Sequence, residues 1–143
     1  MTKEEILKIG FFGERRWLSN MYPCKIEYQG FVFPSSENAY QASKCADKND
    51  KYKFTKIEPV ASKKLGRIVQ LLPNWDSVKL SVMKDIVYSK FFQNPELKQK
   101  LVETEEEELV EHNFWWDKYW GKHFGEGVNN LGIILMDARS LLK

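Results

Sequence analysis

The sequence predicts an α+β fold that is mainly helical and has a small β-sheet. A hairpin pattern comes early in the chain, and several segments with apolar residues at helical spacing follow it. Strands and helices do not alternate as they do in βαβ units, which disfavours a doubly wound parallel sheet. Since the 143 residues contain no linker rich in Pro, Gly or Ser, we expect one domain over residues 1–143.

The hairpin is predicted where apolar residues flank a Gln-Gly dipeptide at positions 29–30. Pro34 is expected to end the second strand, because proline has no backbone N–H to donate to a ladder. Ser35 or Ser36 is then placed to cap a helix over about residues 37–46.

The rest of the chain is predicted to be mostly helical. Apolar spacing predicts helices over residues 59–66, 77–92, 95–103 and 131–142. Pro95 suits a first helical position, and Asn129 or Asn130 suits the cap of the last helix. Residues 109–112 read as a short strand, and the acidic run 105–108 as a solvated turn or helix end.

Composition excludes several classes of protein. The 22 Lys and Arg residues against 20 Asp and Glu give a net charge of +2, which is too balanced for a dedicated nucleic-acid-binding protein. Cys24 and Cys45 form no CxxC pair, and only two histidines accompany them, so no zinc site is expected. No apolar run approaches the ~20 residues that span a bilayer, and residues 1–5 do not resemble a signal peptide. We therefore expect a soluble, cytoplasmic protein.

The helix predicted over residues 37–46 is the first candidate for chemistry. Its alanines share one face, where they allow close packing against another element. The opposite, polar stripe consists of Glu37, Tyr40, Gln41 and Lys44. Glu37 and Lys44 lie two turns apart, about 10 Å along the axis, which flexible side chains largely close. An exposed polar stripe explains this pattern, and so does a stripe that lines a pocket, where a carboxylate steadies a cationic transition state and a desolvated amine is a nucleophile.

The second candidate is the aromatic segment 114–120 and the glycine-containing turn that leads into the last helix. Glycines before a helix N-terminus can expose N–H groups to a phosphate, but this segment matches neither a Walker motif nor GxGxxG. His112 is expected to be a structural hydrogen-bonding residue rather than a general base. Asn20 and Trp75 are explained by turn or capping roles, and Arg67 by either a surface ion pair or a phosphate clamp.

Several short motifs, taken in order, resemble those of the NADAR family, also called YbiA-like proteins. The motifs occupy residues 12–13, 18–20, 30–44, 65–67, 74–75, 78–79, 83, 109–112, 117–121, 127, 129, 131–132 and 135–136. The resemblance thus covers nearly the whole chain, and its most specific parts are the Ser-Glu helix and the Tyr-Trp-Gly to Asn-x-Leu-Gly tail.

The resemblance implies an N-glycosidase that breaks a bond between a nitrogen and C1′ of a ribose. Some family members hydrolyse phosphorylated ribosylamino-pyrimidine intermediates of riboflavin biosynthesis, and others act on ADP-ribose linked to a nucleobase, including guanine in DNA. The family's catalytic glutamate falls on Glu37. Its lysine, proposed to form a transient Schiff base with the opened ribose, falls on Lys44. Asp117 is a candidate for a second acid/base or a ligand of a ribose hydroxyl.

The resemblance also implies a set of substrate contacts. Trp75 and Trp120 are candidates for stacking on the base, and Arg67, Asn20 and the turn from Gly127 to Asn129 for contacts with phosphate and ribose. The further predicted contacts are Phe12, Gly13, Ser36, Tyr40 and Gly121. The expected partner is a small phosphorylated riboside or an ADP-ribose conjugate, with ADP-ribosylated DNA as another substrate to test; no membrane, metal or cofactor is implied.

Two alternatives remain open. A non-catalytic module that holds NAD or ADP-ribose would use the same fold, but it needs neither Glu37 nor Lys44 at this spacing. A nucleic-acid-binding module is disfavoured by the charge balance. Phe114, Trp115 and Trp116 depart from the family pattern and, with residues 122–124, are expected to set specificity, so the sequence leaves the substrate and the oligomeric state open.

Overall fold

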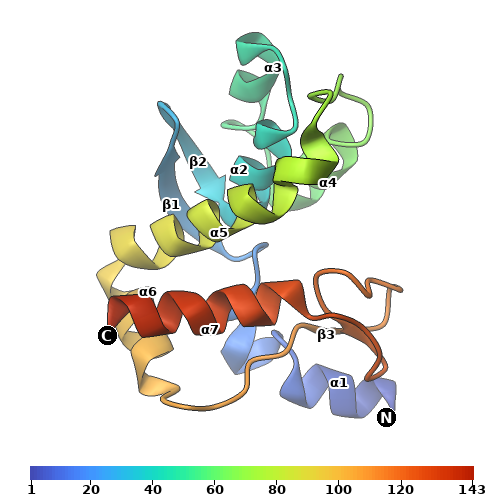
Figure 1. The fold of residues 1–143 in the computed structure, drawn as a ribbon, viewed down its shortest axis with the longest axis vertical. Coiled ribbons are helices and arrows are strands. Elements are labelled where there is room, and N and C mark those ends of the chain that lie inside the picture. Colours follow the sequence, from blue (N-terminus) through green and yellow to red (C-terminus); the bar gives the residue numbers. More distant parts are fainter. The chain divides into compact units, whose positions relative to one another are not determined.

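The helix that carries the polar stripe, α2 (Ser36–Ser43), contacts every other element of the unit to which it belongs. In the computed structural model, which describes residues 1–143, backbone contacts divide the chain into two compact units. One unit is formed by residues 20–95, and the other combines residues 1–19 with residues 96–143. Figure 1 shows the elements of both units in the order of the chain.

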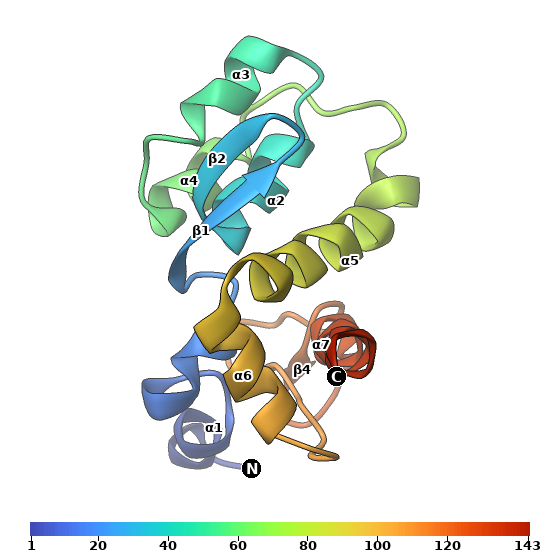
Figure 2. The same ribbon diagram turned by 90° about the vertical axis from the view of Figure 1, so that its left-hand side faces the viewer.

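A β-hairpin opens the unit of residues 20–95, as the sequence predicts. Strands β1 (Pro23–Tyr28) and β2 (Phe31–Ser35) pair antiparallel, with Ile26 opposite Phe33 (Figure 2). The two turn residues, 29 and 30, both have positive φ, of 50° and 86°, which fits the right-handed twist of a tight hairpin. The second strand continues one residue beyond Pro34, so the expectation that proline ends it is wrong by one position.

Helix α2 is shorter than predicted, because its last turn tightens. The N–H groups of Lys44 and Cys45 donate to carbonyls three residues back rather than four. The Lys44 carbonyl then accepts from the Leu72 N–H at 2.8 Å, and Cys45 pairs with Leu71 in an isolated bridge. These tertiary bonds replace the helical ones, so Ala46, which was assigned to the packed alanine face, lies outside the helix and is exposed.

Three more helices complete this unit. They are α3 (Lys48–Lys53), α4 (Pro59–Leu65) and α5 (Trp75–Gln93). The sequence predicts α4 to within one residue and α5 from its third residue onward. It does not predict α3, which buries none of its residues and therefore has no apolar periodicity.

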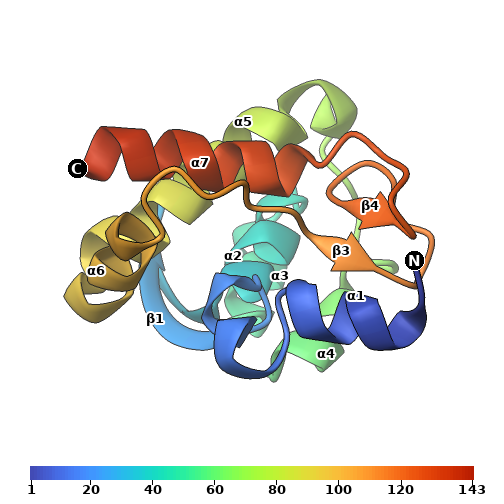
Figure 3. The same cartoon turned by 90° about the horizontal axis from the view of Figure 1, so that it is seen from below.

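The other unit is built on helices that surround a short parallel strand pair. Helices α6 (Pro95–Glu103) and α7 (Asn130–Leu142) match the prediction, whereas α1 (Lys3–Ile9) and the 3₁₀-helix η1 (Gly13–Leu18) were not predicted. Figure 3 shows β3 (His112–Asn113) and β4 (Lys122–His123) side by side, and β3 also contacts α1.

The strand predicted over residues 109–112 is displaced towards the C-terminus. The Asn129 side chain takes the backbone groups that would have formed its ladder: its amide nitrogen donates to the Leu109 carbonyl at 3.0 Å, and its oxygen accepts from the Glu111 N–H at 2.9 Å. The result is a mainly helical α+β fold with two two-stranded sheets. None of the helices combines the length and the apolar character that crossing a bilayer requires.

We predict that Asn38→Ala destabilises the protein strongly. The Asn38 amide is fully buried and donates at 2.8 Å to the carbonyls of Phe54 and Ile57, which joins α2 to the segment after α3. Its removal leaves two carbonyls without this donor, at a cost of about 3 kcal/mol in the free energy of unfolding. Urea denaturation measures this loss; Asn49→Ala, at an exposed position of α3, is the control and should change it by less than about 0.5 kcal/mol.

We also predict that Lys90 makes stability rise with pH. Its side chain is 1 % exposed, and burial lowers its pKa from 10.5 to about 8, with the Cys24 thiol opposing the shift. Between about pH 8 and 10.5 the unfolded chain therefore holds the Lys90 proton that the folded chain has released, and the free energy of unfolding rises by up to about 1.4 kcal/mol per pH unit.

Burial also raises the pKa of Cys24, which makes the free energy of unfolding fall as pH rises. The Lys90 contribution is therefore obtained as the difference in unfolding free energy between the parent protein and a variant that lacks Lys90. Denaturation of the parent protein and of Lys90→Met across pH 7–10.5 should give a difference that grows in favour of the parent as pH rises. Lys84→Met, at an exposed position of the same helix, should give a constant difference. A constant difference for Lys90→Met as well would contradict the prediction.

Candidate functional site

The polar stripe begins at a firmly fixed helix N-terminus. Ser35 caps α2 by accepting a hydrogen bond from the Asn38 N–H at 3.1 Å, as the sequence predicts. The Glu37 N–H donates to the backbone carbonyl of Asn20 at 2.9 Å, and the Asn20 side chain donates to the sulfur of Met83 at 3.4 Å. Asn20 and Glu37, which are far apart in the sequence, are thus adjacent in the structure.

The Glu37 carboxylate is half-buried and lies beside the amide of Gln41, one turn further along α2. The Gln41 Nε2 donates to the Glu37 Oε2 at 2.7 Å. The carboxylate also lies in the first turn of the helix, where the helix dipole favours a negative charge. Both influences favour the ionised form of a carboxyl group.

Lys44 lies at the other end of the stripe, against an aromatic wall. Its ammonium nitrogen is 5.6 Å from the centre of the Tyr40 ring, within cation–π range. The Tyr40 ring is 5.3 Å from that of Trp75, the first residue of α5, and both aromatic side chains are buried. Lys44, Tyr40 and Trp75, all predicted site residues, therefore lie together.

The surroundings of Lys44 lower the pKa of its amino group. Burial is the largest cause that lowers the pKa of Lys44, and the nearby positive charges of Arg67 and Lys79 lower it further. The negative charge of Glu37 acts in the opposite direction without reversing the shift. Lys44 therefore has a larger neutral fraction at a given pH than a lysine in water, and neutral amines are the nucleophilic form.

The unit of residues 20–95 thus contains half of the predicted site residues, on or around one helix. Asn20, Glu37, Tyr40, Lys44 and Trp75 are linked by the contacts above, and Arg67 by its electrostatic effect on Lys44. Ser36 differs from them, because it is fully buried and its hydroxyl oxygen has no hydrogen-bond partner.

Asp117, a predicted catalytic residue, belongs to the other unit and stabilises a turn there. Its carboxylate accepts hydrogen bonds from the N–H groups of Tyr119 and Trp120, at 3.1 and 2.9 Å, while its backbone bonds to the Asn113 side chain. These bonds give Asp117 a structural role that its sequence pattern does not reveal.

The glycine-containing turn before α7 is also held by internal hydrogen bonds. The four N–H groups of residues 128–131 donate to the carbonyls of residues 118–121. A Cβ on Gly127 would overlap the Gly121 carbonyl, and one on Gly121 would overlap Glu111, so both glycines permit close backbone approach. Asn129 adopts a left-handed conformation, with its side chain bonded to the backbone of residues 109 and 111. In the turn expected to bind phosphate, the N–H groups of Val128 and Asn129 therefore already have partners.

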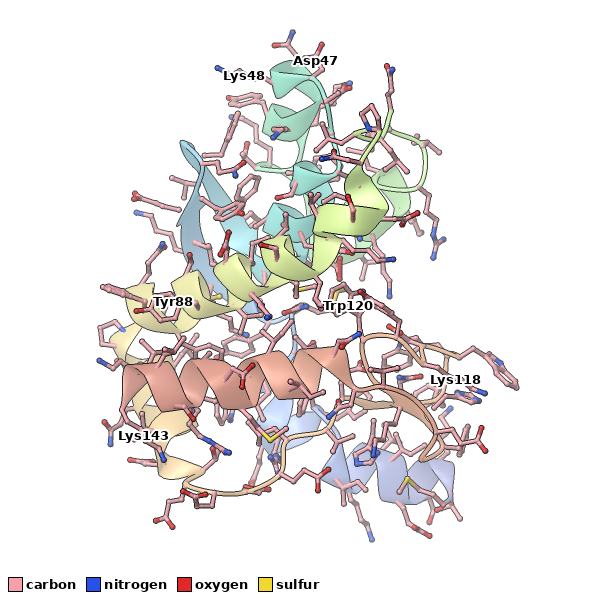
Figure 4. The ribbon with its side chains drawn as sticks, in the orientation of Figure 1. Asp47, Lys48, Tyr88, Lys118, Trp120 and Lys143 are labelled. Carbon is pink, nitrogen blue, oxygen red and sulfur yellow. The ribbon has the colours of Figure 1, made fainter.

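The remaining predicted contacts are aromatic or adjacent to aromatic side chains. Phe12 stacks on Phe114 at 6.1 Å and meets Trp115 edge-on at 6.0 Å, while Gly13 is exposed with a φ of 55°. Trp120, labelled in Figure 4 in the loop that leads to α7, is half-buried and meets Tyr119 edge-on at 4.8 Å. Trp116 is 75 % exposed and stacks on His123.

Two aspects of the site were not apparent from the sequence. Lys79 was not assigned a role, although its charge reaches Lys44 from α5; it also pairs with Asp76, at 3.4 Å. Helical spacing along α5 does not predict this effect, because it depends on how α5 packs against α2.

The expected hydrogen-bonding role of His112 receives no support at its Nδ1 atom, which is buried without a partner. Burial also lowers the pKa of His112. No group of three or more His, Cys, Asp or Glu side chains is close enough to hold a metal ion.

Comparisons with a family model and with a solved structure both give matches over most of the chain. The model of the NADAR domain matches residues 11–143. The solved NMR structure of the E. coli protein YbiA is similar to this chain with a TM-score of 0.82 and 34% sequence identity, over 91% of this chain and 79% of that one.

Curated relatives agree with the structural comparison. The chain is 36% identical over 128 residues to N-glycosidase YbiA of Escherichia coli, covering 87% of this chain and 79% of that protein. It is 39% identical over 131 residues to riboflavin biosynthesis protein VVA0006 of Vibrio vulnificus, which covers 89% of this chain but only 35% of that longer protein. N-glycosidase Npun_R5314 of Nostoc punctiforme is 33% identical over 132 residues. On the family match and these identities, the chain belongs to the NADAR domain family.

Proposed function

We propose that this protein is an N-glycosidase that hydrolyses the bond between a nitrogen and C1′ of a phosphorylated riboside. The observation that carries the proposal is the arrangement along α2, where a carboxylate in the first turn and a lysine of lowered pKa at the C-cap interact electrostatically. A carboxylate and a partly neutral amine are the groups that such a cleavage needs. The enzyme is a hydrolase, and its relatives from three bacteria named above carry the names N-glycosidase or riboflavin biosynthesis protein.

The substrate class that we favour is a ribosylamino-pyrimidine phosphate. The support is the name of the Vibrio relative and that of a second protein, the chloroplastic riboflavin biosynthesis protein PYRR of Zea mays, 32% identical over 127 residues. The matched segment is 35% of the first protein and 20% of the second, so the activity of either whole protein is not transferred by these matches alone. ADP-ribose conjugates, including ADP-ribosylated DNA, are the second class to test.

Glu37 is assigned the role of stabilising positive charge on the ribose. As the C1′–N bond breaks, the nitrogen leaves with the bonding electrons and C1′ becomes cationic. The ionised Glu37 steadies this cation or takes a proton from the attacking water, whose oxygen then bonds to C1′. The departing nitrogen gains a proton, so that one water is consumed in each turnover.

Lys44 is assigned the role of a nucleophile in a covalent route that replaces the direct attack of water on C1′. Its neutral amine attacks C1′, the nitrogen leaving group departs with a proton, and opening of the ribose ring converts the adduct into an imine. Water then hydrolyses the imine and returns Lys44 to its free form. Since burial, Arg67 and Lys79 lower the pKa of Lys44, the reactive form is populated at lower pH than for an exposed lysine.

The charges around Lys44 also suit a phosphorylated substrate. Arg67, in the turn after α4, and Lys79, in α5, both bring positive charge to Lys44, and a phosphate would offset this repulsion. We assign phosphate binding to Arg67 and Lys79, and stacking on the base to Trp75 beside Tyr40. Asp117 remains a predicted second acid/base or ligand of a ribose hydroxyl. The other predicted contacts are Phe12, Gly13, Asn20, Ser36, Trp120, Gly121, Gly127 and Asn129.

We predict that Glu37→Gln abolishes turnover and preserves ligand binding. The amide keeps the size of the side chain but has no charge, and loss of one such electrostatic contribution lowers kcat by about 10²–10³-fold. The assay incubates parent and variant with ribosylamino-pyrimidine phosphate, NAD, ADP-ribose and ADP-ribosylated guanine DNA, and detects the released base by mass spectrometry.

Glu58→Gln is the matched control for this assay, because Glu58 is exposed at the start of α4 and makes no side-chain capping bond. It should retain parental activity. Full activity of Glu37→Gln on every accepted substrate would remove Glu37 from the mechanism. Binding without turnover by the parent on the whole panel would favour the non-catalytic NAD- or ADP-ribose-binding module.

We predict that borohydride traps a sugar on Lys44. Reduction of the imine to a secondary amine leaves a stable adduct, which tryptic mass spectrometry locates in the peptide that contains Lys44. Lys44→Ala should lose both the adduct and most of the turnover, whereas Lys48→Ala, at an exposed position, should keep both. An active protein that yields no adduct on Lys44 would limit this lysine to a role in binding or charge stabilisation.

A further inference from the structure

The hydrogen bond from Gln41 to Glu37 depends on the space left by a third residue, Gly66, and the sequence pattern does not indicate this relation. Gln41 is 5 % exposed, and its Nε2 donates to the Glu37 Oε2 at 2.7 Å. The amide oxygen, Oε1, is buried and accepts no hydrogen bond. A Cβ added to Gly66, just after α4, would overlap this oxygen.

Gly66 is needed for space rather than for its backbone conformation. Its φ of −61° and ψ of −17° are ordinary right-handed helical values that any residue adopts. The atoms that an added Cβ would meet first belong to the end of the Gln41 side chain. The lack of a side chain at position 66 therefore leaves room for the Gln41 amide.

The orientation of this amide has a cost in stability. A buried carbonyl oxygen without a hydrogen-bond donor costs about 1–3 kcal/mol. Rotating the amide by 180° does not remove the cost, because Oε1 would then face the carboxylate oxygen of Glu37 at the present distance of 2.7 Å. An apolar side chain of similar length would fill the same space without an unpaired oxygen. The amide is therefore explained by its hydrogen bond to the Glu37 carboxylate and not by packing.

We propose that Gln41, accommodated by Gly66, is a positioning residue for the Glu37 carboxylate. Its amide N–H fixes the side-chain rotamer of Glu37 and stabilises the ionised form by a charge-assisted hydrogen bond. The role in catalysis rests on the proposed function of Glu37, but the hydrogen bond and its effect on the carboxylate can be tested without turnover.

The first test is Gln41→Met, which keeps the length of the side chain and removes the donor. We expect kcat to fall by about 10- to 100-fold with little change in KM, because the carboxylate is no longer held in place. The acidic limb of the pH–rate profile should move to higher pH, since the ionised form of Glu37 loses a hydrogen bond. The melting temperature should stay the same or rise, because the buried unpaired oxygen is gone.

The control for Gln41→Met is Gln99→Met. Gln99 donates to Glu103 at 2.9 Å with the same spacing of four residues, on the exposed surface of α6. This variant should leave kcat, KM and the pH profile unchanged. A Gln41→Met variant that loses stability and activity together, with an unmoved pH profile, would assign Gln41 to packing and overturn the proposal.

The second test is a double-mutant cycle between positions 41 and 66. Gly66→Ala displaces the amide and should lower kcat, but it should have no further effect in the Gln41→Ala background, where no side chain remains to be displaced. Lys64→Ala, exposed in α4, controls for substitution near the end of that helix. Equal effects of Gly66→Ala in both backgrounds would contradict the link between the two residues.

A third measurement separates this inference from the proposed function. Carbon-13 NMR follows the side-chain carboxyl of Glu37 through its titration in the parent protein and in Gln41→Met. The midpoint should move to higher pH in the variant even if no riboside is turned over, and an unmoved midpoint overturns the inference. Inactivity of the parent on every riboside, with a moved midpoint, would instead reject the proposed function alone.

Discussion

The buried amide of Asn38 is the interaction on which the arrangement of the site depends. Helix α2 has eight residues, too few to be stable alone in water, and seven of them are buried. Its position is therefore set by tertiary bonds, and Asn38 joins the helix to the carbonyls of Phe54 and Ile57. Ser35 caps the start of the helix by accepting from the Asn38 N–H, and the Asn20 carbonyl accepts from the N–H of the preceding residue, Glu37. The direction in which Glu37 leaves the helix follows from these anchors.

Electrostatics gives the two ends of α2 different properties. At the start, the helix dipole and the amide donor of Gln41 favour negative charge on Glu37. At the end, burial and two neighbouring cations disfavour positive charge on Lys44. One short helix thus carries a carboxylate beside an amide donor and, at its end, an amine that gives up its proton more readily than usual, two groups that acid–base and nucleophilic chemistry can use.

Local patterns in the sequence were sufficient for much of the fold. The hairpin, Ser35 as a cap, and helices α4 to α7 follow from turn residues, proline positions and apolar spacing. The end of α2 could not be predicted, because Lys44 and Cys45 bond to Leu72 and Leu71, more than 20 residues away. The polar stripe was likewise visible, but the choice between an exposed stripe and a buried site depends on α4 and α5. The sequence pattern also does not indicate that the absence of a side chain at Gly66 leaves space for the Gln41 amide.

The exposed indole of Trp116 indicates where this protein tolerates amino-acid substitutions. Trp116 has a positive φ of 67°, and its N–H bonds to the ring of the buried His123, so the backbone of the loop is held while the side chain extends into solvent. Replacing a side chain at such a place disturbs little packing, whereas nearly every position of α2 is constrained on all sides. Single substitutions in this loop can therefore be tolerated without first requiring compensating changes in the core.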